Sequence, residues 1–198
     1  MTPENTLLAP QAGSQKGSIA LPAGFPYALN QEVEIPLDQM IPNPQQPRRS
    51  MRKDTLEELA ASMQVKGQEV AAPVRPLTEE ERIAHPGVWV MLIGGHRRRQ
   101  AALMNQFETL KCLVKGIGPK ETHHAAVTDN LHEEMDWWDW DLAIEKEAQL
   151  TGKTQVELIG WMGKSKGKIY KAITITQTLN EAARALVDEN LEKTLKND

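Results

Sequence analysis

Three consecutive arginines, Arg97 to Arg99, are the residues whose type and spacing suggest chemistry most directly. They follow a run of six apolar residues, Val88 to Ile93, and a glycine pair, Gly94 and Gly95. A short apolar run bounded by glycines is typical of a buried strand, and His96 to Met104 then fits a helix. The first turn of a helix presents unpaired N–H groups and partial positive charge. The arginines in that turn therefore predict an anion site, with phosphate as the obvious anion.

The same arginine run has a simpler interpretation. Neighbouring residues on a helix point about 100° apart, so at most two of the three arginines can face one ligand. Basic runs are commonly solvated helix faces, and a glycine pair alone is weak evidence for a phosphate loop. On this stretch alone, phosphate binding and a solvated surface both stay open.

A second stretch, Thr154 to Ala172, predicts two short helices joined by a glycine turn. Thr154 with Glu157 three residues later is a capping-box pattern for the first helix. Gly163 suits the turn, and Ser165 suits the N-cap of the second helix. Two short helices with this connection and a polar second helix are typical of a helix-turn-helix.

Lysines gather on this second helix and its approach, at Lys164, Lys166, Lys168 and Lys171. The stretch between Gly160 and Asn180 contains no acidic residue, although the whole chain has a formal net charge of −4. A local basic face, with Ser165 at its start, predicts contacts to the bases or phosphates of double-stranded DNA. An ordinary helical hairpin with solvated lysines is the alternative.

Strands and helices alternate in the half of the chain that must position the arginines. Strands are expected at 32–37, 72–75, 88–93 and 109–115, and an amphipathic helix capped by Asp54 is expected to end at Gly67. The proline-rich segment 41–49 predicts an extended loop, and 77–87 a charged connector. From Pro119 onward the pattern is helical, with expected helices at 119–130, 137–151 and 178–195 beside the two short ones. This order favours an α+β protein.

Composition limits the classes of protein that fit. The chain has 198 residues and one cysteine, Cys112, which excludes a disulfide framework and a cysteine-rich zinc site and fits a reducing, cytoplasmic setting. No apolar run approaches the roughly 18 residues of a membrane span, and no secretory signal is expected. Residues 1–30 are rich in small and polar residues, and we expect a mostly disordered tail.

Two further features favour structural interpretations. The segment from Glu133 to Asp141 is acidic and holds three of the five tryptophans, which we interpret as a helix junction whose indoles pack between two subdomains. His123 and His124 are neighbours on an expected helix, so their side chains diverge and a shared metal ion is not expected.

Four motifs in order make the chain from about Val33 to Leu186 resemble the ParB partition proteins of bacterial chromosomes and plasmids. They are Ile41–Arg48 (IPNPQQPR), Leu56–Met63 (LEELAASM), Gly95–Ala101 (GHRRRQA) and Asp129–Glu133 (DNLHE), and the helix-turn-helix follows them. The resemblance implies an α+β fold: a small mixed α/β domain of the ParB/sulfiredoxin type over 31–118, then an all-helical domain over 119–198.

The resemblance also implies ligands. In the family the first domain binds CTP and Mg²⁺, the helix-turn-helix binds a palindromic centromere site, and CTP closes the dimer into a clamp that slides on DNA. Carried over to this sequence, the nucleotide site comprises Gly94, Gly95, His96, Arg97, Arg98, Asp129 and Asn130. Asn130 and Asp129 are the expected metal contacts. A homodimer is expected, and the tail is a candidate contact for a partition ATPase.

Three positions depart from the family pattern. His96 and Asp129 replace glutamates, and Glu133 replaces an arginine. These changes affect the expectation of hydrolysis more than that of binding, because a site can bind phosphates without orienting a water molecule for attack. Weak CTP hydrolysis therefore stays open. No separate C-terminal dimerisation domain is visible before Asp198, so the chain is expected to be a fragment or to dimerise otherwise.

Two other functions stay open. One is a plasmid repressor that binds DNA without a nucleotide switch. The other is a nuclease or nucleotidase on the same fold, which needs a metal cluster of carboxylates; only Asp129 with Asn130 offers a start. Sulfiredoxin-like catalysis is excluded, because no cysteine neighbours His96 to supply a thiolate.

Overall fold

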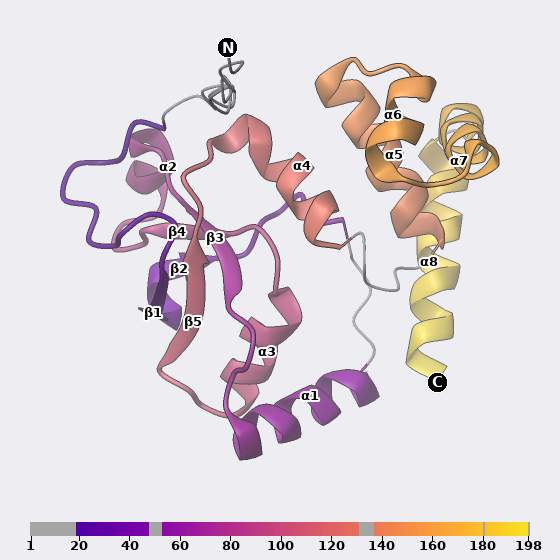
Figure 1. Cartoon of the computed structure of the whole chain (residues 1–198). Helices are drawn as coiled ribbons and strands as arrows, with labels where there is room; N and C mark the ends of the chain where they lie inside the picture. The colour runs from indigo at the N-terminus through magenta and orange to yellow at the C-terminus, as the bar shows by residue number, and fades with distance from the viewer. Residues whose placement is uncertain (1–18, 48–52, 131–136, 180, 198) are drawn as a thin grey trace, which may run out of the picture.

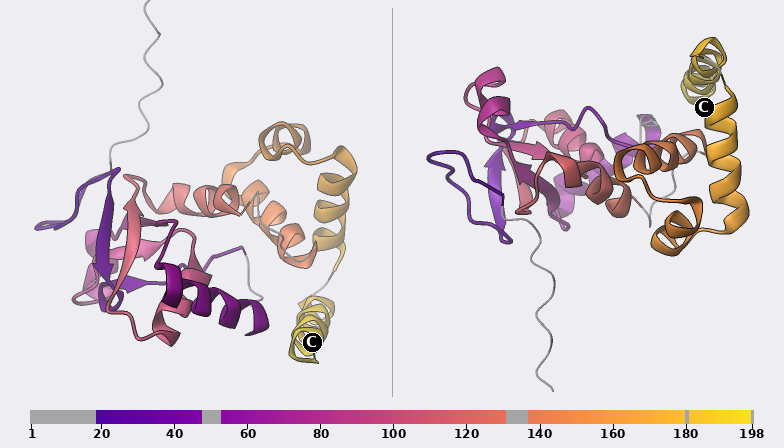
Figure 2. Two further views of the ribbon diagram at one scale, coloured as in Figure 1. Left: turned by 60° about the horizontal axis from the view of Figure 1, so that its bottom comes forward. Right: turned by 90° about the horizontal axis from the view of Figure 1, so that it is seen from above.

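The computed structural model describes residues 19–47, 53–130, 137–179 and 181–197. Within them, five strands form one sheet with helices packed on it, and a group of helices lies to one side of that sheet (Figure 1). We call the first part the sheet domain and the second, which begins with α4, the helical unit. The two views of Figure 2 show the same side-by-side arrangement.

The sheet is mixed. Its strands are β1 (Glu32–Pro36), β2 (Met40–Ile41), β3 (Ala72–Pro76), β4 (Val90–Leu92) and β5 (Thr109–Val114). They lie in the order β1-β5-β3-β4-β2, with β1/β5 and β3/β4 antiparallel and β5/β3 and β4/β2 parallel. Every residue of β3 and β4 is buried, as expected for central strands.

Helices α1 (Lys53–Lys66) and α3 (His96–Met104) pack against each other and complete the core of the sheet domain. Ala60, Met63, Ala101 and Ala102 of these helices are buried in that core. Gly67 ends α1 as expected, in the left-handed conformation with φ +75°. Asp54 lies inside the first turn of α1 and not before it, so the expected cap at Asp54 is wrong.

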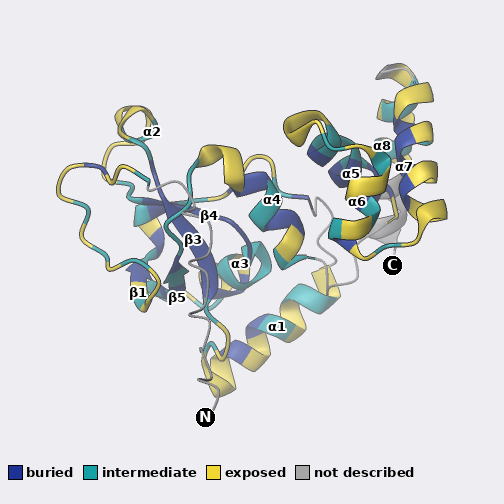
Figure 3. Ribbon diagram, turned by 45° about the horizontal axis from the view of Figure 1, so that its top comes forward, coloured by how far each residue is buried: buried dark blue, intermediate teal, exposed yellow. Residues whose placement is uncertain are grey.

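The helical unit consists of α4 (Pro119–Asp129), α5 (Trp137–Thr151), α6 (Gln155–Met162), α7 (Lys166–Thr178) and α8 (Glu181–Asn197). Its core joins Val127 of α4 to Ile144 of α5, Leu158 of α6 and Ile169 of α7. Figure 3 shows the buried faces of these helices turned toward one another. α7 continues past the expected end at Ala172, because Ile173 and Thr176 are also buried, and the last helix begins at Glu181.

The expected connector at 77–87 contains a helix, α2 (Glu79–Ala84), so that prediction is corrected. Thr78 and Glu81 form a capping box at its start. The Glu81 carboxylate also makes a two-pronged ion pair with the buried Arg75 guanidinium of β3, at 2.6 and 2.7 Å. This pair lowers the pKa of Glu81. The spacing of Thr78 and Glu81 is a local signal for a helix start, which the interpretation of this segment as a connector overlooked, and the ion pair with Arg75 adds a contact to the sheet.

Residues 19–30, which we expected to belong to a disordered tail, pack on the sheet domain instead. Phe25 packs edge-on against Trp89, with ring centroids 6.2 Å apart. The Arg82 guanidinium lies 3.7 Å above the Trp89 ring and donates a hydrogen bond to the Ala23 carbonyl. Aromatic and cation–π contacts to distant residues therefore order a segment whose own composition looks structureless.

Trp138 and Trp140 pack within the helical unit, which corrects the expectation that the indoles of this segment pack between two subdomains. Trp140 is buried in the helical core, and Trp138 donates a hydrogen bond to Asp188 of α8 at 2.8 Å. Trp137 is half exposed. Residues 133–136 of the same segment lie outside the described residues.

The expected fold class is confirmed: a mixed α/β domain is followed by helices alone. None of the described helices is long and apolar enough to cross a membrane.

Candidate functional site

The sharp turn into α3 depends on Gly95. Its φ is +76°, and a Cβ placed on it would lie 2.9 Å from the Ala72 Cβ of β3. Both the conformation and the close approach of the backbone call for glycine. The turn brings the first turn of α3, with its unpaired N–H groups, to the edge of the central strands.

Arg97 and Arg98 both line one pocket, and their guanidinium groups bond to different elements. Arg97 donates a hydrogen bond to the Thr55 carbonyl of α1 at 3.0 Å. Arg98 donates to the Ala71 carbonyl, just before β3, at 2.9 Å. Carbonyl oxygens are modest partners for guanidinium groups, so a phosphate at this position would make the stronger, charge-assisted bond.

His96 joins the same turn to the proline-rich segment. Its Nε2 accepts a hydrogen bond from the Asn43 N–H at 3.1 Å, which requires that nitrogen to be unprotonated. Burial, helped by the positive charge of Arg99, lowers the pKa of His96 to about 4. The ring is therefore neutral at neutral pH and acts here as an acceptor that fixes a loop.

Gly94 permits the close approach of α4. A Cβ on Gly94 would lie 1.8 Å from Oδ2 of Asp129, so the carboxylate occupies the place of the missing side chain. The next residue, Asn130, caps the end of α4, and its Nδ2 donates to the Ala126 carbonyl at 2.7 Å. This bond orients the Asn130 amide and leaves its oxygen as the atom suited to a cation.

A pocket of about 220 Å³ lies between these elements. Five of the seven residues predicted to bind nucleotide line it: Gly95, His96, Arg97, Arg98 and Asn130. Gly94 and Asp129 contact each other next to this wall. The structure thus brings Asn130 together with residues 32 to 35 positions earlier in the chain.

Arg99, the third arginine, points elsewhere. It lines a separate shallow hollow with Leu103 and Phe107, and burial lowers its pKa. The arrangement agrees with the helical spacing, which allows at most two arginines of the run to face one ligand.

The remaining wall of the pocket contains residues that were not predicted to bind nucleotide. Ser62, Met63 and Val70 line it, together with Gln68. The Gln68 side chain pairs with both the N–H and the carbonyl of Lys111 on β5, at 2.9 and 2.8 Å, and so fixes the segment after α1. These bonds span 43 residues of sequence, and no local pattern signals them.

The turn between α6 and α7 is built as the sequence predicts. The Thr154 hydroxyl accepts the Glu157 N–H, and the Glu157 carboxylate accepts the Thr154 N–H at 2.8 Å. Gly163 ends α6 with φ +61°, and the Ser165 hydroxyl caps α7 by accepting the Lys168 N–H at 3.3 Å. The short connection and the exposed start of α7 match the layout of a recognition helix.

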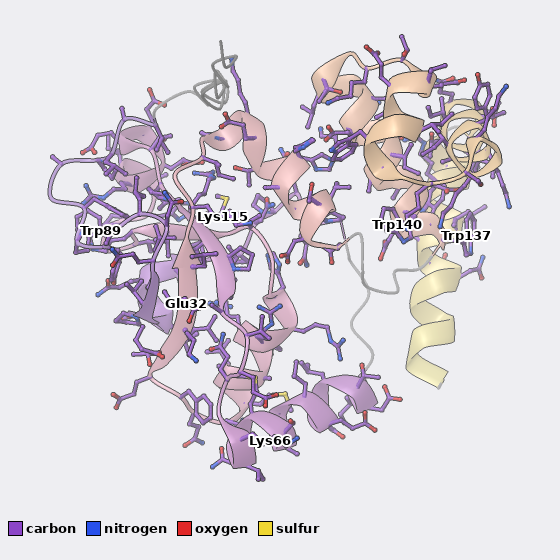
Figure 4. The ribbon with its side chains drawn as sticks, viewed as in Figure 1. Glu32, Lys66, Trp89, Lys115, Trp137 and Trp140 are labelled. Atoms are coloured by element: carbon purple, nitrogen blue, oxygen red, sulfur yellow. The ribbon has the colours of Figure 1, made fainter. Side chains whose placement is uncertain are left out.

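The lysines predicted to contact DNA lie around the start of α7, and three of them lie near aromatic rings. The ammonium groups of Lys164 and Lys168 lie 4.7 and 5.3 Å from the Trp140 ring centroid, within cation–π range. Lys166 lies 5.2 Å from the Tyr170 ring centroid. Figure 4 labels Trp140 in the helical unit that carries these lysines. Lys166, Lys168 and Lys171 are exposed, as is Ser165.

Among the described residues, Asn130 in the pocket wall and its neighbour Asp129 are the candidate metal contacts. The part of the chain that the structure describes contains no group of three or more histidine, cysteine or acidic side chains able to hold a metal ion. Oxygen atoms from an Asp and an Asn suit Mg²⁺, which keeps several waters and commonly takes further oxygens from phosphates. These residues therefore fit an ion that arrives with a nucleotide.

Comparison with known proteins gives the family. Residues 27–131, more than half of the chain, match the family model of the ParB N-terminal domain. This chain belongs to the ParB family. It is 32% identical over 160 residues to the chromosome-partitioning protein Spo0J of Thermus thermophilus, covering 78% of this chain and 54% of that one.

A second ParB relative, the probable chromosome-partitioning protein of Helicobacter pylori, is 29% identical over 85% of this chain and 55% of its own. The chain thus spans about half the length of both relatives. Among solved structures, a C-terminally truncated ParB from Caulobacter crescentus, complexed to the centromeric parS site, shares the fold. The TM-score is 0.56, with 22% identity, over 79% of this chain and 78% of that one.

Proposed function

We propose that this ParB-family chain is a sequence-specific DNA-binding partition protein whose DNA binding is controlled by CTP and Mg²⁺. The observation that carries the proposal is the pocket at the start of α3, where Gly95, Arg97 and Arg98 meet Asn130 of another motif. The family membership supports it, and a Caulobacter crescentus relative is complexed to a centromeric site.

In this proposal the nucleotide phosphates lie at the N-terminus of α3. Arg97 and Arg98 exchange their carbonyl partners for phosphate oxygens, and backbone N–H groups after Gly95 supply further bonds. Asn130 and Asp129 hold Mg²⁺ by their oxygens, and the ion, when bound, neutralises phosphate charge. Gly94 and His96 act indirectly, through the Asp129 carboxylate and the Asn43 N–H.

DNA lies against the start of α7 in the same proposal. We expect Ser165, Lys166 and Lys168, at the start of α7, to contact bases or phosphates, with Lys164 and Lys171 flanking them. Recognition of a palindrome requires two copies of the helix, so a homodimer is part of the proposal. A partition ATPase bound by the N-terminal tail is a further part, as is association with the nucleoid or a plasmid in the cytoplasm.

The first experiment is calorimetric titration with ATP, GTP, CTP and UTP, with Mg²⁺, and with and without cognate DNA. We expect binding of CTP above the other three nucleotides. A protein that binds DNA but none of the nucleotides is a repressor without the switch. Cleavage of plasmid DNA in the presence of Mg²⁺ or Mn²⁺ would instead indicate the nuclease, and phosphate release from CTP measures any hydrolysis.

Arg98→Ala tests the phosphate site against a matched neighbour. A charge-assisted hydrogen bond contributes about 1.5–3 kcal/mol, so Arg98→Ala should weaken CTP binding roughly tenfold or more. Arg99→Ala is the control, because Arg99 lies on the same helix but lines a different hollow. Equal affinities for the Arg98 variant and the wild type would reject the site.

Asn130→Ala tests the metal site. The variant should bind CTP equally well with Mg²⁺ and with EDTA, whereas the wild type should lose affinity in EDTA. Far-UV circular dichroism checks that the variant is folded. A wild type indifferent to EDTA would rule out the metal role.

A further inference from the structure

One segment touches both the nucleotide pocket and the helical unit. This segment, residues 43–47 (NPQQP), is named here the proline loop. On one side, the Asn43 N–H bonds to His96 and Gln46 lines the pocket. On the other side, Pro44, Gln45 and Pro47 line a second hollow of about 210 Å³, whose opposite wall includes His123 of α4 and Leu142, Ala143 and Lys146 of α5.

His123 lies in this second hollow and is 4% exposed. Its Nε2 lies 3.4 Å from the Ala143 carbonyl oxygen. Its Nδ1 is buried without a hydrogen bond of normal geometry, yet the Gln45 backbone lies near enough to act on the ring. Burial lowers the pKa of His123, and the backbones of Ala143 and Gln45 oppose that effect. A neutral imidazole has one N–H, so it can donate to one of these two segments at a time.

The helix that carries His123 also reaches the nucleotide pocket. Asn130, at the end of α4, lines the pocket, and Asp129 lies against Gly94. Val127 of the same helix is buried in the core of the helical unit. Figures 1 and 3 show α4 between the sheet and helices α5 and α6. The proline loop and α4 are thus two adjacent routes from the pocket to α5.

We propose that His123 is a positioning residue that couples the nucleotide pocket to the DNA-binding helices by holding the proline loop against α5. This inference rests on the proposed function. A nucleotide that draws Gln46 and Asn130 toward itself shifts the proline loop and α4 at the hollow that His123 and the loop line together. α5 packs along α7, so the shift reaches the helix proposed to contact DNA.

The test measures coupling and not affinity alone. The DNA affinity of the full chain is measured with and without saturating CTP and Mg²⁺, and the CTP affinity with and without a DNA site selected from random sequence. The factor by which CTP changes the DNA affinity must equal the factor by which DNA changes the CTP affinity, because coupling between two ligands is reciprocal. This common factor is the coupling ratio. In His123→Leu and His123→Asn, the coupling ratio should fall about fivefold or more, while each affinity alone changes less than about twofold.

His124→Asn is the matched control. His124 is the next residue on α4, but its Nδ1 bonds to the Glu147 carboxylate at 2.8 Å and its ring stacks on Trp161, so it makes no wall of the second hollow. The control should keep the wild-type coupling ratio. Thermal denaturation checks each variant, and His123→Asn, which keeps a hydrogen-bonding group, serves if the leucine variant does not fold.

Three outcomes would overturn the inference. The coupling ratio is unchanged in both His123 variants, or it falls equally in His124→Asn, or the wild type binds both ligands without coupling. A wild type that binds no nucleotide at all would instead reject the proposed function itself, and this inference with it.

Discussion

Gly94, two residues before α3, shows how a residue far away in the chain can require a glycine. Gly94→Ala places a Cβ 1.8 Å from Asp129 Oδ2, so the Asp129 carboxylate must rotate out of its place, or α4 or the turn must move. Overpacking of this kind costs about 1–3 kcal/mol. We expect a lower Tm and weaker CTP binding, measured by thermal denaturation and titration.

Gly160→Ala is the control for the Gly94 prediction. It lies inside α6, and a Cβ there meets no atom within 4 Å. Alanine in a helix interior is better than glycine by about 0.5–1 kcal/mol, so this variant should be at least as stable as the wild type. If Gly94→Ala behaves like Gly160→Ala, the close approach of α4 does not constrain this turn.

A single histidine also links pH to stability. The pKa of His96 is about 4 in the folded chain, against 6.5 for an ordinary histidine. A base whose pKa is lower in the folded state contributes its full stability above pH 6.5 and loses it as the pH falls through 4. Protonation also removes the acceptor for the Asn43 N–H.

The measurement is the free energy of unfolding by urea between pH 7 and pH 4. Over this range the wild type should lose up to about 3 kcal/mol more than His96→Gln, which keeps an acceptor but does not titrate. Parallel pH profiles for the two proteins would show that His96 is not held neutral.

At the scale of secondary-structure elements, α7 is a basic helix on which Lys166 and Lys168 lie within cation–π range of Tyr170 and Trp140. Each lysine that neutralises a DNA phosphate adds about 0.9 to the slope of log K against log salt. Lys171→Ala, at an exposed position of α7, should therefore lower the slope by about one and weaken binding to all sequences alike. Lys166→Ala or Lys168→Ala should instead relax sequence preference if either lysine reads a guanine edge.

Lys66→Ala is the control for the salt slope. Lys66 lies at the end of α1, away from the helical unit, as labelled in Figure 4. The control removes the same charge from the chain but not from α7. Equal slopes for the Lys171 and Lys66 variants would mean that the basic face of α7 is solvated surface.

At the scale of the whole molecule, the proposed function makes α7 the DNA-contacting helix of each chain, so we expect tight binding to need two chains on a palindrome. Recognition helices of a dimer reach half-sites about 34 Å apart, or a multiple of that. On a palindrome, the second chain of a bound dimer meets its half-site at a high effective concentration. Removing one half-site removes this second contact and should weaken binding by about a hundredfold or more. Equal affinity for half-sites and palindromes, measured by fluorescence anisotropy, would indicate independent monomers.

The sequence by itself determined the features that depend on local chemistry. The capping pair Thr154 and Glu157, the left-handed turn at Gly163 and the cap at Ser165 all follow from side chains that bond within three residues or from a residue without Cβ. Four of the five strands and the turn into α3 follow from apolar patterning and glycine, whereas β2 at Met40–Ile41 was not predicted. The motif resemblance also predicted the ParB family.

The tertiary structure alone decided the features made by residues far apart in the chain. The packing of residues 19–30 depends on Trp89 and Arg82. The fixed wall at Gln68 depends on Lys111. In each case, the deciding contact lies outside the window that periodicity and capping rules sample. The place of His123, between the proline loop and α5, is of the same kind, because no local pattern distinguishes it from His124.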